Sequence, residues 1–203
     1  MRLLVSATAV ALSVWAAFAA ASGDLRGGVS VGMMRAELPT DGYKDFACVA
    51  PKDKALSGFI DWKTCEADAD NLREMRVAVD EPGQDDTLVA GHPVDLTLGF
   101  DEQGRLARIV IDTKPKGPMY LRKKAFLLGL QARARYGDDG WDCKQSPLGA
   151  DEEPLGTTSV KEHCVKTAGD RRITVDRNLY RKVGADAKAF TSESRVTIDW
   201  AKG

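Results

Sequence analysis

The stretch from Val94 to Asp112 reads VDLTLGFDEQGRLARIVID. Apolar and polar side chains alternate in both of its arms, as they do in strands that turn one face to a core and the other to water. Asp101 to Gly104 separate the arms as a polar turn, in which glycine is free to take a positive φ. The stretch therefore predicts an antiparallel β-hairpin.

Shorter alternating runs predict further strands. They are residues 74–80, Ile173 with Val175, and residues 196–200. Glycine, proline and aspartate are frequent in residues 81–92, which predicts a long solvated loop. Residues 44–71 and 145–158 show no clear period, and we expect them to be irregular. The pattern of residues 178–190 is ambiguous and predicts no single type of secondary structure.

The strongest helical period lies in residues 120–136. Its apolar face repeats at Leu121, Ala125, Leu128 and Ala132. Gly137 follows at the position where many helices end with a positive-φ glycine. In the first half, Ser30 is suited to cap a short helix that continues to Leu38.

The turn-rich segment Lys114–Pro118 divides the chain into two stretches with a similar order of elements. Each stretch begins with helical residues and a cysteine pair and continues with alternating strands. We therefore expect the α+β fold class, with two tandem units that each pack short helices on an antiparallel sheet. The first unit is assigned to residues 22–115 and the second to residues 116–203.

Residues 1–21 have the pattern of a signal peptide. Arg2 precedes the uncharged run 3–23, whose small residues suit cleavage after Ala19 or Ala21. An uncleaved membrane anchor is the alternative, because about 20 apolar residues can span a bilayer. No cysteine lies near the cut, which argues against a lipid anchor. After cleavage we expect no integral membrane segment and a periplasmic or secreted protein.

Composition narrows the class of protein. The chain has 203 residues, 29 of them Lys or Arg and 30 Asp or Glu, for a formal net charge of -1. This balance argues against a dedicated nucleic-acid binder, because such proteins gain affinity by neutralising phosphates. The 43% hydrophobic content is enough for a packed core and excludes global disorder.

The four cysteines of an exported chain predict disulfides. They are Cys48, Cys65, Cys143 and Cys164. Three connectivities are open, and we favour the local pairs Cys48–Cys65 and Cys143–Cys164. A zinc site is disfavoured because the chain has no C-x-x-C spacing.

Enzyme motifs are sparse. Gly28–Gly32 matches G-x-S-x-G, but too few residues precede it to build the central sheet of a hydrolase. His92 and His163 lie in loop-like contexts, where surface histidines are common. We therefore expect no enzyme and no catalytic residue.

Acidic clusters offer an alternative function in ion or small-ligand binding. Oxygen-rich loops can hold calcium, and clusters occur at 85–86, 138–142 and 151–153, but none has the EF-hand spacing. Solvated loop charge is the simpler interpretation, and no metal ligand or cofactor is assigned. The basic residues 122–124 likewise indicate a solvated helix face.

Aromatic residues cluster in the segments that the cysteines would tie together. Tyr43, Trp62 and Trp141 are the candidate binding residues, because tyrosine and tryptophan dominate binding hot spots. The competing interpretation is that these rings pack on the disulfides within the core.

Val29-Ser30-Val31-Gly32-Met33, followed by Glu37-Leu38, resembles the helix-opening signature of the BamE (SmpA/OmlA) family of envelope proteins. Tyr136-Gly137 is similar to a helix ending found in related periplasmic domains. The resemblance implies short helices on a three-stranded antiparallel sheet, and beta-lactamase inhibitory proteins are similar in carrying two such units with one local disulfide each. It implies a binding or scaffolding module and transfers no functional residue.

These observations favour an exported, non-enzymatic protein-recognition module of the bacterial envelope, such as an adaptor, an inhibitor or an immunity factor. The expected partner is another envelope protein, and no nucleic acid is expected. The alternative is a periplasmic binding protein for a metal ion or a small ligand.

Overall fold

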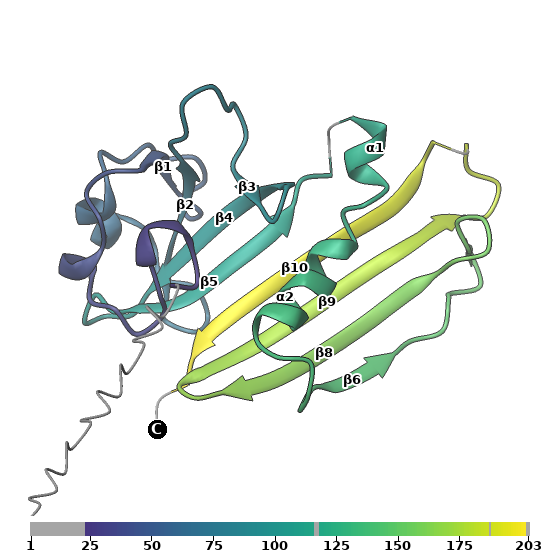
Figure 1. The fold of residues 1–203 in the computed structure, drawn as a ribbon. Coiled ribbons are helices and arrows are strands. Elements are labelled where there is room, and N and C mark those ends of the chain that lie inside the picture. The colour runs from purple at the N-terminus through teal and green to yellow at the C-terminus, as the bar shows by residue number, and fades with distance from the viewer. Residues whose placement is uncertain (1–22, 116–117, 187, 202–203) are drawn as a thin grey trace, which may run out of the picture.

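The computed structural model describes residues 23–115, 118–186 and 188–201. Its main feature is one antiparallel sheet with the strand order β1-β2-β4-β5-β10-β9-β8-β6 (Figure 1). The short strands β3 and β7 pair with β4 and β9. The expected signal peptide, residues 1–21, lies outside the described residues.

Within the described ranges, the sheet contains ten strands. They are β1 (Tyr43–Cys48), β2 (Arg73–Val79), β3 (Leu88–Val89), β4 (His92–Phe100), β5 (Leu106–Thr113), β6 (Asp142–Gln145), β7 (Glu152–Glu153), β8 (Val160–Ala168), β9 (Arg171–Lys182) and β10 (Phe190–Trp200). The helices are short. They are the 3-10 turns η1 (Arg26–Gly28), η2 (Arg35–Glu37) and η3 (Phe59–Thr64), and the α-helices α1 (Met119–Arg122) and α2 (Leu127–Arg135).

The hairpin predicted from residues 94–112 is confirmed as β4 and β5. Leu98 pairs with Ile109, and the turn is held by the Asp101 carboxylate, which accepts from the amides of Gln103 and Arg105. Gly104 takes φ +80° and lies under the Trp62 ring, where a Cβ would come within 3.1 Å of the indole. The turn therefore needs glycine for both its backbone and its packing.

The predicted fold class is wrong, because the two halves do not form separate helix-and-sheet units. The last strand of the first half, β5, pairs with the last strand of the second half, β10, from Asp112↔Arg195 to Arg108↔Asp199. The described chain therefore builds one sheet across both halves. The division of the chain into residues 22–115 and 116–203 stays a prediction.

The first predicted helix, residues 30–38, is reduced to the 3-10 turn η2. Gly32 takes φ +92°, and its amide donates to the carbonyl of Leu106, whose own amide donates to Met33. Backbone pairing with the start of β5 thus replaces a helix. Residues 44–71, expected to be irregular, contain β1 and η3.

The second predicted helix is interrupted between α1 and α2. The Ser194 hydroxyl donates to the carbonyl of Ala125 and accepts from the amide of Gly129. An inserted side chain of this kind takes the place of an i→i−4 bond. The end was predicted correctly, since α2 stops at Arg135 and Gly137 has φ +89°.

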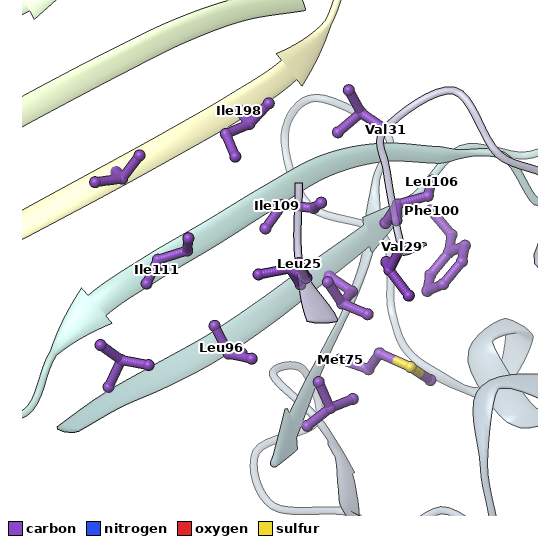
Figure 2. Close-up of a cluster of buried hydrophobic side chains, with 14 of the residues drawn as sticks. Leu25, Val29, Val31, Met75, Leu96, Phe100, Leu106, Ile109, Ile111 and Ile198 are labelled. Carbon is purple, nitrogen blue, oxygen red and sulfur yellow. The ribbon is translucent and has the colours of Figure 1, made fainter. Parts of the chain in front are cut away.

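The core lies on one face of the sheet. Fully buried side chains from β2, β4, β5 and β10 form its centre, among them Met75, Leu98, Phe100, Ile109 and Ile198. Figure 2 shows Leu25, Val29 and Val31 of the N-terminal segment against this cluster. Leu128 and Ala132 of α2 continue the same layer over β9 and β10. Helices and the N-terminal segment thus cover the same face.

Strands β6 and β8 were not predicted. The inward positions of β8 include Glu162 and Cys164, so β8 lacks a hydrophobic stripe. Glu162 is buried because Arg177 of β9 binds its carboxylate at 2.6 Å and Arg133 of α2 approaches at 3.4 Å. The ion pair offsets the cost of burying the two charges. The position of Glu162 faces the core, where the alternation of a strand predicts an apolar residue.

Both local disulfides are confirmed. Cys48–Cys65 joins the end of β1 to the residue after η3, and Cys143–Cys164 joins β6 to β8. These bonds are compatible with an extracytoplasmic protein. In the part of the chain that the structure describes, no helix has the length and apolar character needed to cross a bilayer.

Candidate functional site

The opposite face of the sheet is the candidate functional surface. In β10, the buried Val196 and Ile198 alternate with Arg195, Thr197 and Asp199, which point away from the core. Figure 1 shows α1 and α2 together on one side of the sheet. We call the other side the open face. Its central residues are Asp95, Thr97, Arg108, Val110, Asp112, His163, Val165, Thr174, Asp176, Arg195, Thr197 and Asp199.

An uncharged row crosses the centre of the open face. The strand register places Thr97, Val110, Thr197, Thr174 and Val165 side by side on β4, β5, β10, β9 and β8. All five side chains are β-branched, so they have little rotamer freedom to lose when another molecule covers them. At about 4.8 Å between strands, the row spans roughly 19 Å.

A charged row lies directly beside it. Asp95, Asp112, Arg195, Asp176 and His163 follow one another across the same five strands. The Nε–H and Nη2–H groups of Arg195 donate hydrogen bonds to Oδ1 and Oδ2 of Asp112, at 2.7 and 2.9 Å. This is a bidentate ion pair with fixed geometry. The hydrogen bond with Asp112, together with the charges of Asp176 and Glu193, raises the pKa of Arg195.

A second charged row flanks the other side of the uncharged row. Arg108 donates to Asp199 at 2.7 Å and to Asp70 at 3.0 Å. Burial lowers the pKa of Arg108, but the hydrogen bonds with Asp199 and Asp70 outweigh this effect and raise it overall. Partial burial and the Asp68 carboxylate raise the pKa of Glu74 in the same region. Paired charges therefore border the uncharged row on both sides.

Two adjoining hollows lie on the open face. The first has a volume of about 370 Å³ and is lined by charged and polar groups, among them Asp112, Asp176, Glu193 and Arg195. The second, of about 340 Å³, shares Asp112 and Arg195 and extends over Val110 and Thr197. Small-molecule sites are mostly apolar, so polar hollows on a sheet face are better suited to the side chains of a protein partner.

Two of the three predicted binding aromatics lie in the core. The Tyr43 hydroxyl donates to the carbonyl of Arg26 at 2.7 Å, and burial raises the pKa of Tyr43 to about 12. Trp62 is 5% exposed and packs against Phe100. Neither ring offers much surface to a partner, and their role in binding stays a prediction.

Trp141 is half-buried near β6. Its indole Nε1 donates to the carbonyl of Gly137 at 2.7 Å, and the charged ends of Arg133 and Lys166 lie 5.9 and 5.7 Å from the ring centre. Trp141 belongs to the second half of the chain, whereas Tyr43 and Trp62 belong to the first. Tyr43 and Trp62 nevertheless belong to one buried cluster, against which Trp141 packs as a partly buried residue. The role of Trp141 in binding also stays a prediction.

The enzyme-like residues are not brought together either. Ser30 of the G-x-S-x-G pattern donates to the carbonyl of Gly28 and accepts from the amide of Asp24, beside the buried Val29 and Val31. His163 instead contacts Asp176 on the open face, with 2.7 Å between Nδ1 and Oδ1. Both hydrogen bonds of the Ser30 hydroxyl are therefore with backbone groups and not with a general base.

Several carboxylates of the acidic loops are paired with lysines of the same chain. Asp86 accepts from Lys114, and Glu152 accepts from Lys161 at 2.8 Å. The hydrogen bond from Lys161 lowers the pKa of Glu152 to about 2. These lysines supply the counter-charge that an ion would otherwise provide.

Among the residues that the structure describes, one group has ligand atoms close enough together for a metal. Cys143, Cys164 and Glu162 have ligand atoms within 4.8 Å of one another. The two sulfurs are joined in a disulfide, and the Glu162 carboxylate binds Arg177. The chemistry of this group therefore does not suit a metal ion.

No protein-family model, curated protein or solved structure matches this chain. The resemblance to the BamE family therefore stays a prediction. The open face cannot be recognised in the sequence, because its residues are distributed over separate strands. The sequence does show the polar residues that alternate with the apolar ones in each strand. From the sequence alone, these residues can be assigned only to the solvent-facing side.

Proposed function

We propose that this protein is an exported recognition protein of the bacterial envelope that binds another protein through the open face of its sheet. The charge-free N-terminal run and the two disulfides support an extracytoplasmic location. The observation that carries the proposal is the open face itself. It presents a β-branched row between two charged rows, with two hollows beside it.

The open face is preorganised for binding. Its residues lie on strands that are hydrogen-bonded on both sides and backed by fully buried side chains such as Leu98 and Ile198. Pre-ordered side chains reduce the entropy that association costs. A rigid surface of mixed polarity suits a protein partner, because the recognition interfaces of proteins that also exist apart are about as polar as ordinary protein surface.

Site-specific photo-crosslinking tests this proposal. A photoreactive amino acid is placed at Thr197, in the middle of the open face, and separately at the exposed Lys123 after α1 as the matched control. Both variants are expressed with the natural leader in the source cells. We expect one defined protein adduct from Thr197 and none of the same mass from Lys123. Equal adducts at both positions, or none at Thr197, contradict the proposal.

The binding stoichiometry gives the second measurement. The adduct protein is identified by mass spectrometry, purified and titrated with the unmodified chain. We expect saturation at a fixed ratio, and competition by the unmodified chain in the crosslinking reaction. Failure to saturate shows that the adduct is a chance neighbour and contradicts the proposal.

A further inference from the structure

The two hollows of the open face differ in charge. Glu74 and Asp112 of the second hollow are balanced by Arg108 and Arg195. In the first hollow, three carboxylates surround Arg195 alone. The imbalance of two negative charges is therefore local to one part of the face.

The neighbours of the first hollow leave this imbalance in place. Arg195 makes its two-point pair with Asp112. Glu193 accepts from the neutral amide of Asn178 at 2.9 Å, and Asp176 contacts the ring of His163. The next cation along β8, Lys161, donates to Glu152. Glu193 thus has a neutral hydrogen-bond partner, and it shares the charge of Arg195 with Asp112 and Asp176.

We propose, on the basis of the function proposed above, that the partner protein presents a basic contact surface and places a lysine or arginine side chain in the first hollow. A cation there lies between Asp176 and Glu193 and compensates the local negative charge. Its aliphatic stem can cover the neighbouring β-branched row, as long basic side chains do on apolar surface. Charge complementarity of this kind selects partners and accelerates their encounter.

A peptide assay tests the charge preference directly. The probes are fluorescent octaarginine and octaglutamate, titrated with the full mature chain. The double variant Asp176→Asn/Glu193→Gln removes the two carboxylate charges with side chains of nearly the same shape. The matched control, Asp138→Asn/Asp139→Asn, makes the same change of net charge in the exposed loop after α2.

We expect octaarginine to bind the natural chain with an affinity that falls as salt rises. The open-face double variant weakens this affinity at least tenfold, the loop control changes it less than twofold, and octaglutamate does not bind. Equal loss in both double variants reveals non-specific charge attraction and overturns the proposal. Tight binding of octaglutamate, or no binding of octaarginine, also overturns it. Thermal unfolding of each variant verifies that the fold is intact.

Two further outcomes separate this inference from the proposed function. If the partner captured at Thr197 binds the natural chain and the open-face double variant equally, the charge preference is wrong and the proposed function stands. If Thr197 captures no partner while octaarginine binds as expected, the proposed function fails and the cation preference stands. A dimer of the natural chain that the double variant dissociates assigns the hollow to a second copy and overturns the proposal of a separate partner.

Discussion

The two faces of the sheet are built from alternate residues of the same strands, yet they have opposite roles. On β10, Ile198 is 1% exposed and lies in the core, while its neighbour Thr197 occupies the centre of the open face. Charges differ in the same way. Glu162 and Arg177 are buried under α2, whereas Arg195 and Asp112 pair in contact with solvent. One face maintains the fold, and the other is the proposed binding surface.

The largest expected loss of stability comes from breaking the buried ion pair, and the exposed ion pair is its comparison. Glu162→Gln leaves Arg177 and Arg133 without their carboxylate under α2, and we expect it to lower the free energy of unfolding by about 3–5 kcal/mol. Asp112→Asn breaks an exposed pair and is expected to cost less than about 1 kcal/mol. Urea unfolding monitored by tryptophan fluorescence measures both. Similar losses from the two variants contradict the contrast between the faces.

The next largest loss of stability is expected from truncating one of two adjacent residues of β10, the one that faces the core. Ile198→Ala opens a cavity in the core and is expected to cost about 2–5 kcal/mol. Thr197→Ala removes only a partly exposed β-branched side chain and is expected to cost less than about 1 kcal/mol. The same urea titration compares them. A loss of more than 2 kcal/mol from Thr197→Ala would show that the open face is part of the stabilising core.

A smaller effect is expected where α2 meets the covered face. Gly129 lies so close to β9 that a Cβ there would come within 2.5 Å of the Arg177 side chain and 2.8 Å of Val175. Gly129→Ala therefore has to displace the helix, at an expected cost of about 1–3 kcal/mol. Leu130→Ala, on the exposed side of α2, is the control and should cost less. Thermal unfolding gives both values, and an increase in stability from Gly129→Ala would reject this packing.

The smallest effect is a pH dependence at the covered face. Burial lowers the pKa of His92 below its ordinary 6.5, assisted by Lys124 and opposed by a hydrogen bond with Gln131. The unfolded chain then binds a proton more readily than the folded chain. His92 therefore favours the folded state above about pH 6.5, and this contribution is lost as the pH falls.

The variant His92→Asn tests this pH dependence. The free energy of unfolding of the natural chain should decrease more steeply between pH 7.5 and 5.5 than that of the variant. Urea titrations across this range supply the two slopes. Parallel slopes would show that His92 does not contribute to the acid sensitivity.

Several elements could be predicted because their physics is local. The β4–β5 hairpin follows from period-2 alternation around a glycine turn, and the end of α2 follows from Gly137. The disulfides follow from the even number of cysteines in an exported chain and the preference for nearby partners. None of these predictions requires knowledge of what lies across the sheet.

The elements that could not be predicted depend on distant residues. The helical period of residues 120–136 gives no sign that Ser194 will bond to Ala125 and Gly129 and so interrupt the helix before α2. The polar β8 becomes a strand because Arg177 meets Glu162 from the next strand. A single sequence contains both partners of each contact but does not indicate that they meet.

The sequence by itself determined the alternation of the strands, the turn chemistry, the cysteine pairs and the leader-like N-terminus, because each depends on neighbouring residues. Only the tertiary structure decided that β5 and β10 join the two halves into one sheet. The same pairing brings Asp112 beside Arg195 and creates the open face. The physical reason is that strand register depends on residues far apart in the sequence. The neighbours of each side chain on adjacent strands are therefore defined only once the sheet has formed.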